Sequence, residues 1–416
     1  MIKLRRRLHV VDLDYQVVVV GAGPVGLVTA LGLAKLGHSV LLLEQNSAEV
    51  PAQWRGSTIH PPTLEIFDGL GLAEEIINGA VKVEVLQYRD LEIPEVVDFD
   101  YQVLRGKVKF PFRLQFEQYK VLKLLRTKAA DNPKIEIRYE SKVLGISQDS
   151  QSVTLEISTK DREYKVNCGW LVAADGSHSS VRKSLGIELT GFTYPFPTTV
   201  VATPFAFEDH FPGLAPVTYW SGPTGRLSMI RTPDIWRIAM TTPLEGVDLS
   251  SEDKGTITEP TADFKVAVSL LLKLIPGVTL ADLQLKQYEV YRSHQRVAGQ
   301  FSLGRVALAG DAAHLTTTNG GMGLNSGVQD AAALVAAIDE AIAKGSAEPI
   351  ERYGIERKEF CERFLQPTTS ANHKTVDNPD FDSRKMRLAN LSSDANDPQI
   401  ELEVVARASM LTQILK

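Results

Sequence analysis

The stretch "VVVVGAGPVG", residues Val17–Gly26, predicts how the N-terminal part of the chain folds. The β-branched run Tyr15–Val20 is typical of a buried strand, and it ends at a glycine. Helical spacing follows over Val25–Leu36, and a second apolar run covers Ser39–Leu43. The order strand, helix, strand within about thirty residues predicts a parallel βαβ unit.

The glycines of this stretch have the spacing G-x-G-x-x-G between the strand and the helix. The first allows a tight turn, the second allows backbone to approach a pyrophosphate, and the third allows the helix to lie close to the strand. Glu44, at the end of the second strand, is placed to accept hydrogen bonds from a ribose, and its charge favours FAD or NAD over NADP. The residues assigned to this dinucleotide site are Gly21, Gly23, Pro24, Val25, Gly26, Glu44 and Gln45.

Length and composition limit the protein class. A chain of 416 residues is long enough for two or three packed units. The net charge of −6 contains no block of like charge, so no nucleic-acid footprint is predicted. Cys168 and Cys361 form no Cys-x-x-Cys pair, which argues against a disulfide framework or a zinc site. Acidic residues and glycines interrupt the uncharged N-terminal stretch, so we expect a cytoplasmic protein with no membrane span.

The rest of the sequence predicts six further helices and an antiparallel sheet in the middle of the chain. Helical spacing covers Pro62–Leu70, Gln115–Ala130, Asp263–Leu274, Asn325–Ala343, Ile350–Phe364 and Ile400–Ile414. Short alternating segments predict an antiparallel sheet from Ile135–Tyr139, Val153–Ser158, Tyr164–Val166, Thr198–Ala206, Arg226–Arg231 and Trp236–Thr242. A last buried strand is expected over Gly304–Ala309, and the final fifty residues are expected to begin as a loop.

Two motifs later in the sequence indicate a family. "LVAADGSHSSVR" (Leu171–Arg182) and "GRVALAGDAAH" (Gly304–His314) resemble motifs of the flavoprotein aromatic hydroxylases, the p-hydroxybenzoate hydroxylase-like family. The resemblance extends to Arg55 in "QWRGSTIHPPTLEIF", to Gln115 and to "YGIERKEF" (Tyr353–Phe360). It covers roughly residues 15 to 365, and the motifs stand in the order typical of the family.

The resemblance implies an α/β fold in which a Rossmann-type FAD-binding domain is interleaved with an antiparallel-sheet substrate domain and followed by a C-terminal helical segment. The FAD-binding domain is expected over 1–80, 107–185 and 295–365. The substrate domain is expected over 81–106 and 186–294. Residues 366–416 are expected to form a helical cap or tail, or an oligomer contact such as that of a homodimer.

The resemblance also implies an activity. FAD would be reduced by NADH or NADPH as a transient donor and would react with O₂ to a C4a-hydroperoxyflavin, which hydroxylates a phenolic or N-heteroaromatic small molecule. Because the cofactor performs the difficult chemistry, no catalytic triad is required. Two alternatives keep the same scaffold: a reductase or dehydrogenase that inserts no oxygen, and a flavin-holding protein that sequesters an intermediate.

The stretch Gly310–Gly327 would close the flavin site. Asp311 follows a buried strand, where ligands of open α/β sheets bind, and the resemblance implies that it holds the sugar-alcohol chain of FAD. The glycines expose backbone to a flat ring, and the positive end of the following helix would stabilise the reduced flavin. The flavin contacts implied here are Asp311, Gly320, Gly321, Met322, Gly323, Leu324 and Asn325, together with Arg55, Gln115 and Asp175.

This chain departs from the family beside the expected flavin. Thr317 and Thr318 stand where relatives usually carry Pro-Pro, and Met322 replaces a Gln. These departures keep the alternatives without oxygen insertion open. His314 is a weak catalytic candidate, with packing at the strand–helix junction as the simpler explanation.

The resemblance implies that substrate contacts lie on the middle sheet. Aromatic and apolar side chains with one cation would suit a planar, acidic ring. The candidates are Tyr219, Trp220, Met229, Arg231 and Trp236, of which Tyr219 and Arg231 are also weak catalytic candidates. For each one alone, filling of the core is the simpler explanation.

Overall fold

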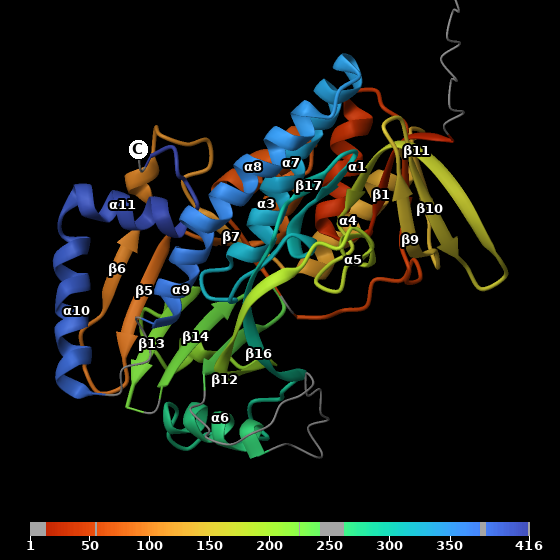
Figure 1. The fold of residues 1–416 in the computed structure, drawn as a ribbon. Helices are drawn as coiled ribbons and strands as arrows, with labels where there is room; N and C mark the ends of the chain where they lie inside the picture. Colours follow the sequence, from red (N-terminus) through yellow and green to blue (C-terminus); the bar gives the residue numbers. More distant parts are fainter. Residues whose placement is uncertain (1–13, 55, 224, 242–261, 375–379, 415–416) are drawn as a thin grey trace, which may run out of the picture.

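The structure is a computed structural model that describes residues 14–54, 56–223, 225–241, 262–374 and 380–414. These residues form two eight-stranded sheets and one three-stranded sheet. Figure 1 shows the first sheet with its helices at the upper right, the second sheet below it, and the C-terminal helices α10 and α11 at the left edge. A cavity lies where the second sheet, the C-terminal helices and the start of a helix that packs on the first sheet meet.

The first sheet has a parallel centre. Its strands are β1 (Tyr15–Val20), β2 (Val40–Leu43), β8 (Ile135–Arg138), β9 (Lys142–Gln148), β10 (Val153–Ser158), β11 (Glu163–Ala173), β17 (Ser302–Leu303) and β18 (Val306–Leu308). β1 pairs in parallel with β2 and β11, and β11 pairs in parallel with β18. The βαβ unit predicted at the N-terminus is therefore confirmed. The β1 residues Val17–Val20 are all buried, as their unbroken apolar run requires.

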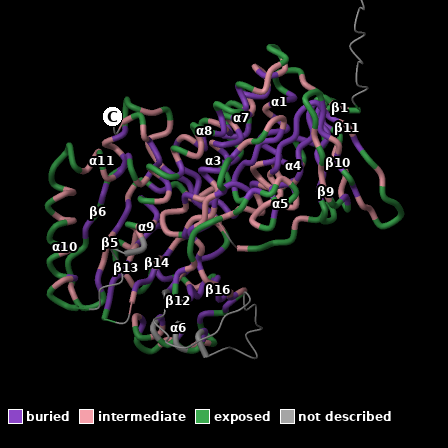
Figure 2. Tube along the Cα trace, in the orientation of Figure 1, coloured by how far each residue is buried: buried purple, intermediate pink, exposed green. Residues whose placement is uncertain are grey.

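Helices pack on both faces of this sheet and against one another. They are α1 (Pro24–Lys35), α2 (Pro61–Gly69), α3 (Ala73–Gly79), α4 (Gln118–Ala130), α5 (Ser180–Ser184), α7 (Met322–Lys344) and α8 (Glu348–Phe360). A Cβ at Gly32 of α1 would lie 2.7 Å from the Val335 side chain of α7, so this glycine sets the close approach of the two helices. Figure 2 shows the buried core concentrated around β1, β11, α1 and α4.

The second sheet is built from segments between those of the first. Its strands are β5 (Val85–Asp90), β6 (Val97–Asp100), β12 (Leu189–Thr203), β13 (Val217–Gly222), β14 (Gly225–Arg231), β15 (Trp236–Thr241), β16 (Gln287–Ala298) and β19 (His314–Leu315). All neighbours are antiparallel except β13 and β5. Helix α6 (Ala262–Lys273) covers one face with an apolar cluster that includes Phe264 and Leu271. The interleaved α/β architecture expected from the resemblance is present.

The C-terminal helices cover the outer strands of the second sheet. They are α9 (Gln366–Lys374), α10 (Phe381–Ala395) and α11 (Pro398–Ala408). Leu388 and Val405 join Leu86 and Phe99 in one apolar cluster. A buried ion pair reinforces the contact, because Arg384 of α10 donates from Nε to Asp90 of β5 at 2.9 Å.

Two predictions about strands and helices were wrong in part. The predicted strand at Ile135–Tyr139 is no member of an antiparallel sheet, because β8 pairs in parallel with β2 at the edge of the first sheet. The predicted strands at Val153–Ser158 and Tyr164–Val166 are antiparallel neighbours, but as β10 and β11 they also belong to the first sheet and not to the middle one. Alternation of apolar residues indicates a strand but carries no information about its partner. Gln115 does not open a helix, because it ends β7 (Arg113–Gln115), which pairs with β3 (Thr58–Ile59) and β4 (Val81–Val83).

The prediction of a loop after residue 365 was also wrong. Helix α8 continues through a π-helical turn, Cys361–Leu365, directly into α9. In α10 only Arg384 and Leu388 are buried, so the apolar pattern that marks a surface helix is almost absent. Its helix is stabilised by packing on β5 and β6, which the local sequence does not reveal.

Candidate active site

The three glycines of the turn after β1 differ in what a Cβ would meet at each position. Gly21 adopts φ +102°, and a Cβ there would lie 2.3 Å from the carbonyl oxygen of Ala174. A Cβ at Gly26 would lie 1.9 Å from the carbonyl oxygen of Gly21, so the helix can approach the turn only with glycine. A Cβ at Gly23 would meet nothing within 4 Å. The turn therefore has open space at the one glycine that was expected to face a phosphate.

Glu44 holds this turn against the end of β2. One carboxylate oxygen accepts from the Ala22 N–H at 2.9 Å, and the other accepts from the backbone and side chain of Asn46 at 2.8 Å. The side chain is 8% exposed, and the oxygen that accepts from Ala22 retains a lone pair for a further donor such as a ribose hydroxyl. Its neighbour Gln45 is exposed.

Asp175 and Arg182 lie where β11 ends beside the turn. The Oδ2 of Asp175 accepts from the Ser180 N–H at 2.8 Å at the start of α5, whereas its buried Oδ1 has no partner among the described residues. Arg182 is buried and donates to the carbonyl oxygens of Ala312 and Ser177. An acceptor without a partner beside an open glycine turn fits a polar ligand such as a dinucleotide.

Asp311 lies at the carboxyl end of β18, as the strand pattern predicted. Its side chain is exposed, but the protein atoms crowded around it raise the pKa of its carboxyl above the ordinary value. Because the side chain reaches solvent, water screens part of this effect. Gly310 and Gly327 both lie against Val25, whose side chain would be 2.9 and 2.7 Å from a Cβ at these positions. The glycine-rich turn and the second motif are thus in direct contact.

Helix α7 begins three residues earlier than predicted, at Met322. Gly320 and Gly321 adopt φ +89° and +67°, and the helix start has no side-chain cap among the described residues. Its first N–H groups and the positive end of the helix dipole are therefore available to a negatively charged group. Gly323 and Leu324 lie in the first turn and are half-buried.

Two of the side chains that were expected to contact the flavin form hydrogen bonds with other groups of the protein. Asn325 accepts from the His60 N–H at 2.8 Å and donates to the carbonyl oxygens of Thr58 and Gly321. Gln115 accepts from the Ser57 hydroxyl at 2.8 Å and is buried. These side chains position the loop before α7. Arg55, a third expected contact, lies outside the described residues.

His314 belongs to a buried network. Its Nε2 is 2.7 Å from Asp330, which also accepts from Arg357 at 2.7 Å, and its ring stacks on Phe301. Burial acts to raise the pKa of Asp330, but the charge of Arg357 and the hydrogen bonds with Arg357 and His314 hold it well below its ordinary value. These contacts match the packing explanation of His314.

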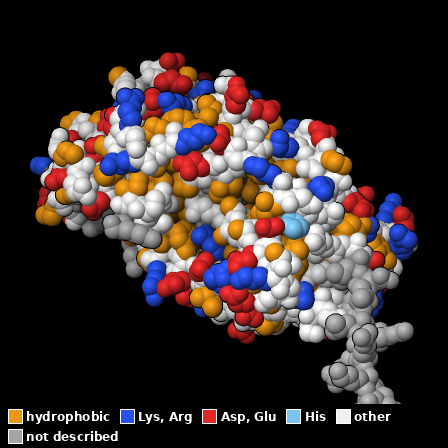
Figure 3. Space-filling model, turned by 90° about the horizontal axis from the view of Figure 1, so that it is seen from above, with side chains coloured by type: hydrophobic (Ala, Val, Ile, Leu, Met, Phe, Trp, Pro, Cys, Tyr) orange, Lys and Arg blue, Asp and Glu red, His pale blue; other side chains and the backbone are white. Residues whose placement is uncertain are grey.

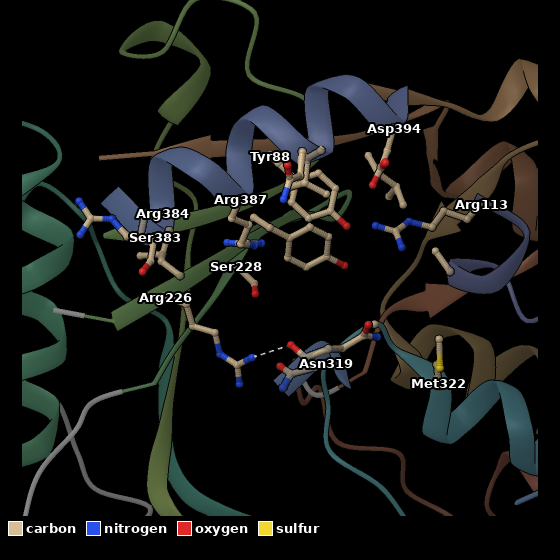
Figure 4. A pocket seen from close by; sticks show the side chains of 18 residues that line it. Tyr88, Arg113, Arg226, Ser228, Asn319, Met322, Ser383, Arg384, Arg387 and Asp394 are labelled. Carbon is tan, nitrogen blue, oxygen red and sulfur yellow. Dashed lines mark hydrogen bonds between the residues drawn. The ribbon is translucent and has the colours of Figure 1, made fainter. Parts of the chain in front are cut away.

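A cavity of about 590 Å³ opens between the second sheet, the start of α7 and the C-terminal helices. Figure 4 shows its walls, with α10 on one side and Met322 at the end near α7. Two tyrosine rings, Tyr88 and Tyr219, pack together at a centroid distance of 5.4 Å within it. Its other lining residues are Leu86, Arg113, Arg226, Leu227, Ser228, Asn319, Gly320, Asn372, Ser383, Arg384, Arg387, Asn390, Leu391, Asp394 and Ala408.

Of the substrate contacts predicted from sequence, Tyr219 lines this cavity. Trp220, Met229 and Trp236 point to the opposite side of their strands and fill the apolar core under α6. Arg231 is not among the lining residues, because it donates to the Thr232 carbonyl at 2.8 Å and its Nε lies 3.6 Å from Glu208. On β13 the neighbours Tyr219 and Trp220 lie on opposite faces, whereas Met229 and Arg231 of β14 lie two residues apart on the same face.

The sequence analysis missed Arg113, which lines the cavity and is only 2% exposed. A signal was available, because this arginine stands alone in the apolar segment Phe110–Phe116 ("FPFRLQF"). Arg387 was also missed, and the polar sequence around it in α10 offered no comparable signal. Their position in the cavity depends on segments that are distant in sequence.

On the face seen in Figure 3, charged side chains of both signs are interspersed. Within the described ranges, no helix is both long and apolar enough to cross a bilayer.

Comparison with known proteins agrees with this geometry. The model of a family described as "FAD binding domain" matches residues 14–368. A para-nitrophenol 4-monooxygenase of a Pseudomonas species is 33% identical over 364 residues, covering 86% of each chain. The 6-hydroxy-3-succinoylpyridine 3-monooxygenase of Pseudomonas putida is 29% identical over 371 residues, covering 88% of this chain and 90% of the relative.

Among solved structures, the p-nitrophenol 4-monooxygenase of Pseudomonas putida superposes with a TM-score of 0.84 at 29% identity, covering 95% of this chain and 98% of that one. The match extends over both large sheets and the C-terminal helices, as its coverage requires. The cofactor is FAD, and the chain belongs to the family of FAD-dependent aromatic hydroxylases, which are monooxygenases.

Proposed function

We propose that this enzyme hydroxylates a small phenolic or N-heteroaromatic compound, with NADH or NADPH as electron donor and O₂ as oxygen source. The observation that carries the proposal is the cavity lined by Tyr88 and Tyr219, which ends at the N-terminus of α7. Relatives with similar sequences are named for a nitrophenol and for a hydroxylated pyridine. Flat walls of aromatic and apolar side chains suit such rings.

Bound FAD would accept electrons from the nicotinamide and deliver one oxygen atom of O₂ to the ring. The protein's part is to hold this group and orient the substrate beside it. In our assignment, the turn Gly21–Gly26 and α1 hold the pyrophosphate, Glu44 and Gln45 hold the ribose, and Asp175 and Asp311 serve the remaining polar groups. The backbone from Gly320 to Asn325 would face the flat ring, where the start of α7 favours negative charge.

The substrate end of the site must keep water out, because water destroys reactive oxygen-transfer species. Leu86 and Leu227 supply apolar wall on the sheet side, and Leu391 supplies it on the α10 side. We therefore assign α10 as part of the substrate site. Tyr219 is retained as a substrate contact, whereas the placement of Arg231 and His314 favours structural roles for them.

Reduction of the bound flavin under anaerobic conditions tests the proposal. NADH or NADPH is added to the purified holoenzyme with and without a panel of phenols and N-heteroaromatics, and the loss of flavin absorbance is followed. We expect one ring class to accelerate the reduction and, once ¹⁸O₂ is admitted, to carry one labelled oxygen atom in its product. Nicotinamide oxidation without labelled product would favour a reductase, and a bound flavin that no nicotinamide reduces would favour a sequestering protein.

Three further expectations stay predictions: the domain division at residues 81–106 and 186–294, a homodimer, and a cytoplasmic location. Size-exclusion chromatography with light scattering would test the dimer directly.

A further inference from the structure

Asp330 in α7 carries a buried carboxylate that the proposed chemistry does not use. Its side chain is completely buried, although it lies in a helix whose start reaches the flavin site. Its Oδ2 accepts from the Gly310 N–H at 3.0 Å and lies 2.7 Å from Nε2 of His314. Its Oδ1 accepts from Nε of Arg357 in α8 at 2.7 Å. Three segments of the chain therefore meet at this one carboxylate.

The contact between Gly310 and Asp330 is a charged hydrogen bond. Burial acts to raise the pKa of Asp330, but Arg357 and His314 hold it well below its ordinary value, so the carboxyl is ionised. An ionised carboxylate only accepts hydrogen bonds, so Nε2 of His314 carries a proton and donates it to Asp330. A hydrogen bond from a backbone N–H to an ionised group is stronger than one between neutral groups. Asp330 therefore constrains the backbone at Gly310 strongly.

Gly310 belongs to the turn that carries Asp311. It adopts φ +60°, and a Cβ there would lie 2.9 Å from the Val25 side chain, so the turn requires glycine. On the other side of Asp311, the carbonyl oxygen of Ala312 accepts from the buried Arg182 at 3.1 Å. Buried charged side chains thus hold the backbone before and after Asp311, whereas the side chain of Asp311 is exposed.

Asp330 also connects this turn to the helix assigned to the flavin ring. Helix α7 begins at Met322, and Asp330 follows about two helical turns later. The same helix therefore presents its N-terminus to the site and holds the turn of Asp311. The spacing between these two parts of the FAD site depends on one rigid element and one buried carboxylate.

We propose that Asp330 is a positioning residue for FAD, whose carboxylate fixes the Gly310 N–H and thereby holds Asp311 against the sugar-alcohol chain of the cofactor. His314 and Arg357 keep the carboxylate in place and do not touch the cofactor. The inference rests on the proposed function, because it needs the assignment of Asp311 to FAD.

The two halves of FAD distinguish this role from a general contribution to folding. ADP shares the ribose and the pyrophosphate of FAD but has no sugar-alcohol chain and no ring. In our assignment, ADP contacts the turn Gly21–Gly26 and Glu44 but not Asp311. Loss of a merely structural network would weaken the binding of both ligands, whereas a displaced Asp311 weakens the binding of FAD alone.

Release of FAD from the holoenzyme measures the effect. The holoenzyme is diluted in series, and the fluorescence of released FAD gives the dissociation constant of FAD. Displacement of FAD by added ADP gives the dissociation constant of ADP. Asp330→Asn keeps the shape of the side chain but has one acceptor oxygen for three donors. We expect it to raise the dissociation constant of FAD about 10- to 100-fold and to leave that of ADP unchanged.

Tyr353→Phe is the matched control. The buried Tyr353 hydroxyl donates to the Leu308 carbonyl oxygen at 2.8 Å, so this variant also removes a buried hydrogen bond between α8 and the end of β18. Leu308 precedes the turn of Asp311. The variant should therefore lower the midpoint of urea unfolding and leave the dissociation constants of FAD and ADP unchanged.

A double variant separates the role of Asp330 from the assignment of Asp311. Asp311→Ala alone should raise the dissociation constant of FAD about 10-fold or more. Adding Asp330→Asn should cause little further loss, because the side chain that Asp330 positions is already absent. If Asp311→Ala binds FAD like the wild type, the assignment of Asp311 under the proposed function fails. If the two losses multiply in full, that assignment holds and the role of Asp330 is refuted.

Unchanged FAD binding by Asp330→Asn, or equal weakening of FAD and ADP, overturns the inference. If this variant yields no folded holoenzyme, His314→Leu carries the test, because it removes one donor to Asp330 and retains the Gly310 hydrogen bond. His314→Leu should raise the dissociation constant of FAD about 3-fold without changing that of ADP. No change for FAD, or the same change for ADP, then overturns the inference in the same way.

Discussion

The glycine-rich turn and the cavity, which we assign to one active site, are built in different ways. The turn comes from one continuous segment, Val17–Gly26, in which Gly21 and Gly26 leave no room for a Cβ and Gly23 lies in open space. The cavity is lined by residues from β5, β7, β13, β14, the loop before α7, and three C-terminal helices. A local motif can be recognised in sequence, whereas a wall assembled from distant segments cannot.

The largest effect is expected inside the turn. Gly26→Ala places a Cβ 1.9 Å from the Gly21 carbonyl oxygen and should lower the free energy of unfolding by about 4 kcal/mol or more. Gly23→Ala is the matched control, because its Cβ meets no protein atom within 4 Å. We expect Gly23→Ala to unfold like the wild type in urea but to bind FAD more weakly. Equal destabilisation by both variants would contradict this division of roles.

The next largest effect is expected where α10 is attached to the second sheet. Arg384→Met would leave the Asp90 carboxylate buried without its cation, at a cost of about 3 kcal/mol. Urea unfolding measures the loss, and hydrogen exchange of α10 should increase before that of α1. Arg363→Met removes an exposed pair with Glu359 and should cost less than about 1 kcal/mol.

An effect that is small near neutral pH and grows as the pH falls is expected beside the cavity. The pKa of His60 is about 3 in the folded protein, against an ordinary value of 6.5. Between these pH values His60 is protonated in the unfolded chain and neutral in the folded protein. The unfolding free energy should therefore fall as pH falls from 6.5 toward 3, by about 1.4 kcal/mol per unit for this group.

His60→Gln tests this assignment, because it retains an N–H donor for the Gly320 carbonyl, which lies 3.0 Å from Nε2 in the wild type. The difference in unfolding free energy between variant and wild type should change with pH over this window. A constant difference would show that His60 does not titrate as described.

The smallest effect is expected at the arginine that sequence analysis favoured. Arg231→Gln should change stability by less than about 1 kcal/mol, because its ion pair with Glu208 is long and partly exposed. Its steady-state KM for the aromatic substrate should match the wild type. A large rise in KM would show that Arg231 contacts the substrate and would contradict its placement outside the cavity.

Sequence analysis correctly predicted the βαβ unit, the strand before Asp311 and the interleaved architecture, the last through a family resemblance. Its strand pattern assigned β8, β10 and β11 to the wrong sheet, began α4 three residues early and treated the start of the tail as a loop. In each case the local sequence pattern fits more than one structure, and contacts with residues distant in sequence decide which one forms.

The sequence by itself determined the glycine turn and the polar strand ends, because steric demands and backbone geometry act over a few residues. It also carried the motifs that mark the family. Only the tertiary structure decided that Arg113 lines the cavity and Arg231 does not. That choice depends on which face of β7 and β14 meets the C-terminal helices, and α10 takes its place through burial rather than through its own pattern.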